Sequence, residues 1–158
     1  MEAKEKYNLE FKAKVAKTFL KTVSAYANYN DGEIIFGIDD NGDLTGINAA
    51  KDESLRIENM INDSIAPVPD FGIEVREIDK KEIIILGVKK GKDTPYYYQG
   101  KTYKRSDTST IEVDRFELRR LAIEGINIDY EERKAYSQNL RFSKLESQLK
   151  EKAGIKKI

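Results

Sequence analysis

The residues EKYNLEFK at positions 5–12 and NDGEIIFGIDD at positions 30–40 decide the fold, because they predict two strands that flank a helix. Polar and apolar residues alternate over 7–12, which is typical of a half-buried strand. Residues 34–38 are almost entirely apolar and are bounded by turn residues, which predicts a buried strand. Gly32 precedes this strand, in a turn where we expect a positive φ.

The residues between these two strands have the spacing of an amphipathic helix that begins near Lys14. Its apolar residues recur at intervals of four, three and four, and they are Ala16, Leu20, Val23 and Ala27. This spacing places them on one face of the helix. The lysines at 14, 17 and 21 then fall on another face.

The remaining patterns complete a fold of the α+β class. We expect a helix over 53–65 that ends before Pro67, and another over 113–123 with an acidic residue, Asp114, near its start. Strands are predicted over 44–47, 73–78 and 83–88, with a tight turn at 79–80. A third hairpin is predicted from 96–98 and 101–105. The expected architecture is a mixed, mostly antiparallel sheet built from hairpins, with flanking helices.

The chain changes character beyond Gly125, where it becomes strongly polar. Two short helical patterns follow, around 131–136 and 142–150. We therefore expect one domain over 1–125 and a polar helical appendage or linker over 126–158.

The composition narrows the chemistry that is available to this protein. The 28 basic residues balance the 28 acidic residues, so any attraction for a polyanion must come from a local patch. Cysteine, histidine and tryptophan are absent, which excludes disulfides, thiolate nucleophiles, histidine bases and the usual zinc ligand sets. The chain begins with charged residues and contains no apolar run long enough to span a membrane, so we expect a cytoplasmic protein without a membrane partner.

Three acidic residues stand at the ends of neighbouring elements: Glu5, Glu10 and Asp40. If they converge, they could hold Mg²⁺ or Mn²⁺ against a phosphodiester, because these hard cations prefer oxygen ligands. Ordinary explanations remain open for all three, and Glu5 lies near the amino terminus, where a charged residue needs no special role. Glu10 could be the solvent-facing residue of a strand, and Asp40 could be a turn residue.

Basic and aromatic residues indicate a second kind of site, which needs no cofactor. The residues that we expect to contact nucleic acid are Lys12, Lys14, Lys17, Lys21, Lys101, Tyr103, Lys104 and Arg105. Lysine and arginine bind phosphates, and tyrosine rings stack on unpaired bases. The alternatives are a solvated helix face for the lysines and ordinary core packing for about half of the tyrosines near the hairpin.

Several motifs, taken in order, resemble the Schlafen Alba-like domain over about residues 5–120. They are E-x-x-x-x-E-F-K from Glu5, S-A-x-A-N from Ser24, F-G-I-D-D with G-x-x-x-G-I from Phe36, and P-x-Y with Y-x-R-S from Pro95. The chain departs from the family pattern at Asp31 and Asp107, where glycine is usual. The resemblance implies a mixed sheet with flanking helices that binds DNA or RNA.

The resemblance leaves three functions open. In prokaryotes such domains are described as DNA-binding modules of transcriptional regulators, which implies a nucleic-acid-binding amino-terminal module. Some animal members cleave transfer or ribosomal RNA, and their acidic trio corresponds to Glu5, Glu10 and Asp40, which implies a metal-dependent endoribonuclease acting on structured RNA. The third possibility is a catalytically inert dimerisation scaffold. Because the domain is duplicated in the animal proteins, the resemblance also implies a homodimer.

Overall fold

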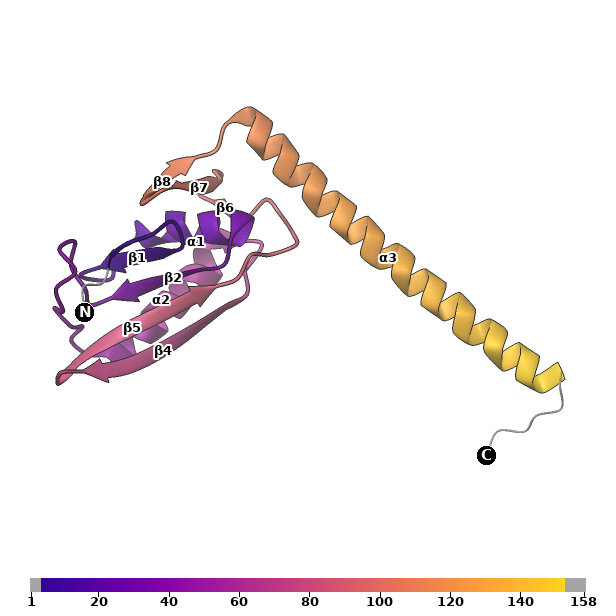
Figure 1. Cartoon of the computed structure of the whole chain (residues 1–158), viewed down its shortest axis with the longest axis horizontal. Coiled ribbons are helices and arrows are strands. Elements are labelled where there is room, and N and C mark those ends of the chain that lie inside the picture. Colours follow the sequence, from indigo (N-terminus) through magenta and orange to yellow (C-terminus); the bar gives the residue numbers. More distant parts are fainter. Residues whose placement is uncertain (1–3, 153–158) are drawn as a thin grey trace.

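The structure is a computed structural model that describes residues 4–152, and it consists of a compact domain from which one long helix projects (Figure 1). Its elements in chain order are β1 (Leu9–Lys12), α1 (Phe19–Tyr29), β2 (Gly32–Phe36), α2 (Ala50–Ser64), β3 (Ile65–Ala66), β4 (Phe71–Ile78), β5 (Lys81–Val88), β6 (Tyr97–Tyr98), β7 (Tyr103–Ser106), β8 (Ser109–Glu112) and α3 (Arg115–Lys152).

Four strands form the central sheet in the order β1-β2-β5-β4. Only β1 and β2 pair in parallel, with Lys12 opposite Phe36, while β2–β5 and β5–β4 are antiparallel. Two small antiparallel sheets, β3–β6 and β7–β8, complete the fold. The predicted class is therefore confirmed: this is an α+β fold with a mixed, mostly antiparallel sheet.

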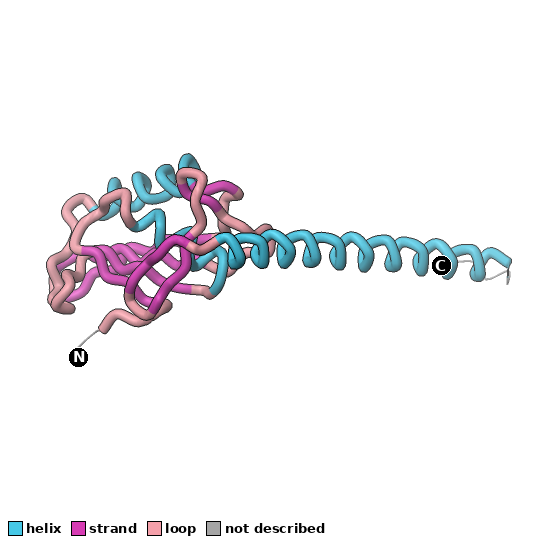
Figure 2. Tube along the Cα trace, turned by 90° about the horizontal axis from the view of Figure 1, so that it is seen from above, coloured by secondary structure: helices cyan, strands magenta, loops and turns pink. Residues whose placement is uncertain are grey.

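The hydrophobic core lies between the central sheet and the two helices α1 and α2, which cover the same face of the sheet (Figure 2). Phe19 of α1 meets Phe36 of β2 edge to face, with the ring centroids 5.3 Å apart. Ile57 and Ile61 of α2 are completely buried in the same cluster. The alternating and continuous apolar patterns of the strands thus supply the inner face of the sheet.

Gly32 has a different role from the one that its turn-like surroundings predict, because its φ does not lie in the left-handed region. Instead, a Cβ at this position would lie 2.5 Å from atoms of the buried Tyr26 ring. The residue must be a glycine because β2 begins directly against the last turns of α1.

The first helix is shorter than predicted and begins at Phe19. Lys14 and Lys17 consequently lie in the connection between β1 and α1, and only Lys21 lies on the helix. The predicted strand over 44–47 is also reduced, to an isolated bridge between Ile38 and Leu44.

The third hairpin lies one strand later than predicted. Tyr98 and Lys101 form only an isolated bridge, and Tyr98 is instead paired with Ile65 of β3. The true hairpin joins β7 to β8, and Asp107 in its turn has a φ of 57°. This left-handed conformation favours glycine, which accounts for the glycine usual at this position.

The last helix, α3, runs without a break from Arg115 to Lys152, where the sequence predicts a helix and two short helical segments. Asp114 caps its first turn by accepting a hydrogen bond of 2.8 Å from the backbone N–H of Glu117. The helix passes position 125, so the expected domain boundary falls inside it. Within residues 4–152, no helix has both the length and the apolar composition needed to cross a membrane.

Candidate nucleic-acid interface

Four lysines occur within ten residues around the start of α1. Lys12 ends β1, Lys14 and Lys17 lie in the following connection, and Lys21 lies in the first turn of the helix. The last three are exposed, and Lys12 is half-buried. This group, Lys12, Lys14, Lys17 and Lys21, is called the lysine segment below.

Within the described residues, no carboxylate lies at ion-pair distance from any lysine of this segment. The Lys12 ammonium donates a long hydrogen bond of 3.4 Å to the hydroxyl of Thr18. The Lys21 ammonium lies 5.8 Å from the centre of the Tyr103 ring, in a cation–π contact. The segment therefore keeps a positive charge that the protein itself does not neutralise.

The other predicted contact residues are mostly engaged within the protein. Lys104 donates a hydrogen bond of 2.6 Å to Glu117, which also accepts one of 2.9 Å from Tyr29. The Lys104 ammonium lowers the pKa of the Glu117 carboxyl. Tyr103 is buried beside Tyr98, and burial raises its pKa. Lys101 is exposed, with Glu112 3.9 Å away.

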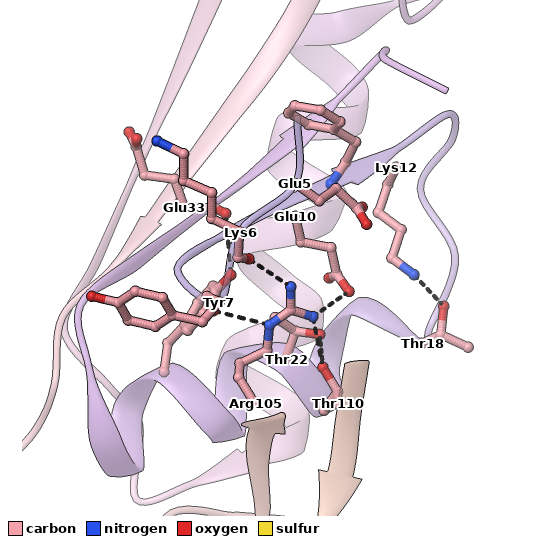
Figure 3. A network of polar contacts seen from close by, with 12 residues as sticks. Glu5, Lys6, Tyr7, Glu10, Lys12, Thr18, Thr22, Glu33, Arg105 and Thr110 are labelled. Atoms are coloured by element: carbon pink, nitrogen blue, oxygen red, sulfur yellow. Dashed lines mark hydrogen bonds and ion pairs between the residues drawn. The ribbon is translucent and has the colours of Figure 1, made fainter. Parts of the chain in front are cut away.

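Arg105, predicted as a phosphate contact, lies instead at the centre of a hydrogen-bond network within the protein (Figure 3). Its side chain is only 4 % exposed. The guanidinium donates to the carbonyl oxygens of Lys6 and Tyr7, to the hydroxyl of Thr110, and to Glu10 at 3.1 Å. Four hydrogen bonds to the protein leave this side chain unavailable to a phosphate in the folded structure.

The three acidic residues of the proposed metal site have different surroundings. Glu10 pairs with Arg105 through Oε1, whereas its buried Oε2 has no hydrogen-bond partner among the described residues. Glu5 accepts a hydrogen bond of 2.8 Å from the backbone N–H of Phe11. Asp40 is exposed, and the turn hydrogen bonds come from Asp39, which accepts from two backbone N–H groups.

These carboxylates do not form a ready cation site. Glu5 and Glu10 both lie in electrostatic range of the buried Tyr26 hydroxyl, so they share one neighbourhood. However, no three acidic residues in the stretch from 4 to 152 are close enough to hold a metal ion together. The oxygen ligands suit Mg²⁺ or Mn²⁺ in kind, but the geometry does not assemble them.

A hollow of about 620 Å³ lies elsewhere, at the start of β2 and the end of β5. Asp31, Glu33 and Asp70 line it, and Lys89 is its only lysine. Because β1 and β2 run in parallel, this hollow lies at the opposite end of β2 from Lys12. Its acidic lining is unsuited to phosphate.

Ser24 and Asn28, the two polar ends of the S-A-x-A-N motif, hold the fold around the site, a role that the sequence did not predict for them. Asn28 accepts a hydrogen bond from the Tyr96 backbone N–H at 2.7 Å and donates to the Tyr96 carbonyl at 3.1 Å. Ser24 donates to the same carbonyl at 2.8 Å and accepts from the Tyr103 N–H at 3.3 Å. Their spacing of four within an apolar helix is the signal that could have indicated a buried polar pair.

Solved structures share this fold at low sequence identity. The DIP2311 protein from Corynebacterium diphtheriae is 19% identical, with a TM-score of 0.57 over 71% of this chain and 26% of that chain. The N-terminal domain of a RecG-related protein from Nitrosomonas europaea is also 19% identical, with a TM-score of 0.53 over 72% of this chain and 85% of that one. This chain thus spans about a quarter of the corynebacterial protein.

No curated protein sequence matches the chain. A family model does match: that of Schlafen, AlbA_2, over residues 1–114, which includes every strand and ends just before α3. This match covers most of the chain and contains the motifs around Glu5, Ser24, Phe36 and Arg105. The protein therefore belongs to the Schlafen AlbA_2 family.

Proposed function

We propose that this protein binds nucleic acid, and that the lysine segment supplies the phosphate contacts. One observation carries the proposal: four lysines lie within ten residues, and no carboxylate of the described chain pairs with them. The side chains of Lys104 and Arg105, by contrast, are already paired with Glu117 and Glu10. Among the basic residues that we expect to contact nucleic acid, a polyanion therefore gains most by binding the lysine segment.

The physical basis is the release of counterions from the nucleic-acid backbone. Each phosphate that a lysine neutralises releases condensed cations, so the affinity falls as salt rises. Because the net charge of the chain is zero, the attraction is local and short-ranged. The Thr18 hydroxyl beside Lys12 adds a hydrogen-bond donor suited to a phosphate oxygen.

The comparisons support this proposal in general terms. The chain belongs to the Schlafen AlbA_2 family, for which the motif resemblance implies DNA or RNA binding, and one structural neighbour is the N-terminal domain of a protein named for its relation to an ATP-dependent DNA helicase. We extend the proposal to a cytoplasmic, amino-terminal module of a transcriptional-regulator-like protein.

The test measures fluorescence anisotropy with labelled single-stranded and duplex DNA and RNA. The affinity should fall steeply between about 50 and 200 mM salt. The triple variant Lys14→Gln, Lys17→Gln, Lys21→Gln should reduce the slope of log K against log salt by about 2–3, since each duplex phosphate contact contributes about 0.9. These lysines are exposed, so folding should be retained.

A matched triple variant, Lys51→Gln, Lys80→Gln, Lys89→Gln, removes the same charge from exposed positions elsewhere. It should change the slope much less. Equal effects of the two triple variants would mean that binding depends only on the net charge of the protein, and would reject the lysine segment as the binding site. Absence of binding to all four ligands would favour an inert scaffold.

A second candidate function, metal-dependent RNA cleavage, is favoured by the unpartnered Oε2 atom of Glu10. Among the described residues, Glu5, Glu10 and Asp40 are not close enough to hold a metal ion together, so this function requires that RNA or Mn²⁺ draw them into one site. The assay incubates the protein with transfer RNA and Mn²⁺. Cleavage by the wild type but not by Glu10→Gln, with normal cleavage by the exposed control Glu33→Gln, would establish the enzyme. Cleavage that Glu10→Gln leaves unchanged would reject it.

A further inference from the structure

The amino-terminal part of α3 packs against the domain through one face. Leu121 is buried, and its carbonyl accepts a hydrogen bond of 2.7 Å from Thr94. At Gly125 the helix backbone approaches the Thr94 carbonyl so closely that a Cβ would clash with it. Lys90 and Lys92 of the domain form ion pairs with Glu124 and Glu132. These contacts define the inner face of α3.

The outer face of the same part is apolar and uncovered. Ile123, Ile126 and Tyr130 are each more than half exposed, and Leu140 further along is too. Their spacings of three, four and ten place them at positions a, d, a and d of one heptad register, which is the seam of a coiled coil. Two seam positions between them are polar, at Arg133 and Ser137.

Beyond Glu132, no hydrogen bond or ion pair among the described residues joins α3 to the domain, and the helix extends away from it (Figures 1 and 2). The twenty residues from 133 to 152 correspond to about 30 Å of helix. Isolated helices of this length are marginal in water, because most helical stability in proteins comes from the packing of one face. We therefore expect residues 133–152 to be stabilised by packing against another helix.

The charges of α3 are divided into two adjacent blocks of opposite sign. Residues 124–132 carry four acidic and no basic residues: Glu124, Asp129, Glu131 and Glu132. Residues 133–145 carry four basic and no acidic residues: Arg133, Lys134, Arg141 and Lys144. Within the described chain, no carboxylate forms an ion pair with Lys134, Arg141 or Lys144, whereas Arg133 pairs with Asp129.

We propose that α3 pairs with α3 of a second copy of this chain in an antiparallel arrangement. Antiparallel pairing places the acidic block of each copy opposite the basic block of the other, whereas parallel pairing would place like charges together. It also lets the part around Leu140 cover the outer face at Ile123 and Ile126 of the partner copy. Each chain thus supplies both the apolar surface and the opposite charge that the other lacks.

This arrangement is compatible with the domain, because the inner and outer faces of α3 differ. The projecting part of one copy lies along the outer face of the other, while the two domains stand at opposite ends of the pair. The lysine segment lies in the domain, outside this seam, so each copy would present its own nucleic-acid interface. The pairing does not rest on the proposed function.

The first test is the mass of the full chain in solution, by sedimentation at several concentrations. We expect a dimer whose dissociation constant rises at least tenfold in the variant Ile126→Ser, Tyr130→Ser, Leu140→Ser. The control Leu55→Ser, Val68→Ser, Ile111→Ser changes three comparably exposed apolar residues elsewhere and should leave the dimer intact. Circular dichroism checks that both variants fold.

The second test determines the direction of pairing by disulfide cross-linking, for which the natural absence of cysteine is an advantage. Ile123→Cys or Ile126→Cys should cross-link to Leu140→Cys when the two proteins are mixed. Each single variant alone should not cross-link, because its two thiols would be at least about 15 Å apart in antiparallel helices. Self-linking of each single variant would show parallel pairing and overturn the proposal.

The charges provide a third test. Lys134→Glu, Arg141→Glu, Lys144→Glu should be monomeric alone, and so should Asp129→Lys, Glu131→Lys, while their mixture should form a heterodimer. A monomeric wild type at high concentration would contradict the proposal. If the basic-block variant lost nucleic-acid affinity and no variant changed the mass, the basic block would be a nucleic-acid contact and the pairing would be rejected.

Discussion

Arg105 and Glu10 lie 95 positions apart in the sequence and form an ion pair of 3.1 Å between side chains that are only 4 % and 10 % exposed. The same guanidinium binds the carbonyls of Lys6 and Tyr7. Through these hydrogen bonds, Arg105 of β7 holds the segment that precedes β1 in place. A basic residue of the Y-x-R-S motif is thus engaged within the protein.

Replacing Arg105 by methionine should lower the free energy of unfolding by about 3–5 kcal/mol, because the Glu10 carboxylate would remain buried without its partner. Urea unfolding followed by circular dichroism measures this change. The double variant with Glu10→Gln should recover part of the loss. As a control, Arg76→Met breaks an exposed pair with Glu74 and should cost less than about 1 kcal/mol.

The sequence predicted the elements that depend on local pattern. Alternation revealed β1, the apolar run revealed β2, and the dipeptide Asp79-Lys80 marked the β4–β5 turn, where both residues have positive φ. Such signals arise within a few neighbouring residues. They are therefore visible before any tertiary contact is known.

Long-range partners could not be read in the same way. Whether Arg105 faces solvent or pairs with Glu10 depends on how two strands that are distant in the chain are placed. Similarly, residues 96–98 have the pattern of a hairpin strand, but the Asn28 side chain of α1 forms hydrogen bonds with the backbone N–H and carbonyl of Tyr96. The acidic candidates follow from their positions at the ends of elements and from motif order, and neither shows that Asp39 rather than Asp40 accepts the hydrogen bonds of the turn. The sequence therefore indicates which residue types can form a site, but not which residues contact one another.

Two lysines that look alike in the sequence should differ in nucleic-acid binding. Lys17→Gln should weaken binding at low salt several-fold, because no carboxylate of the described residues pairs with its exposed ammonium. Lys104→Gln should have a smaller effect on affinity, since its ammonium is already paired with Glu117. Anisotropy titrations of both variants with the same duplex make the comparison. A larger loss for Lys104→Gln would place the interface on β7 instead.

Glu117 should make the stability depend on pH on the acid side. The hydrogen bond from Lys104, aided by that from Tyr29, lowers the pKa of Glu117 below its ordinary value of 4.5. The stabilisation is then fully present above that ordinary pKa and is lost as the pH falls through the lowered one. The difference in stability between the wild type and Glu117→Gln should shrink from about pH 6 to about pH 3.

Thermal unfolding at a series of pH values measures this difference. The control is Glu58→Gln, an exposed carboxylate on α2, which should show a smaller change over the same range. A constant difference between wild type and Glu117→Gln at all pH values would mean that the ionised form of Glu117 is not what Lys104 stabilises.

Any substitution of Asn28 that removes the amide N–H donor should destabilise the protein. In Asn28→Asp, the carboxylate would face the Tyr96 carbonyl, to which the amide now donates at 3.1 Å, and a buried charge would replace a satisfied amide. We expect a loss of about 3 kcal/mol or more in the free energy of unfolding. The exposed Asn62→Asp on α2 should change it by less than about 0.5 kcal/mol.

Gly32 and Gly72 lie in strands of the same sheet and should respond oppositely to alanine. A Cβ at Gly32 would meet the buried Tyr26 ring at 2.5 Å, while one at Gly72 would have no atom within 4 Å. Gly32→Ala should therefore cost about 1–3 kcal/mol through overpacking, whereas Gly72→Ala should be neutral or slightly stabilising because it reduces the entropy of the unfolded chain. Urea unfolding compares them. Equal losses would show that the close approach of β2 to α1 is less rigid than the contacts indicate.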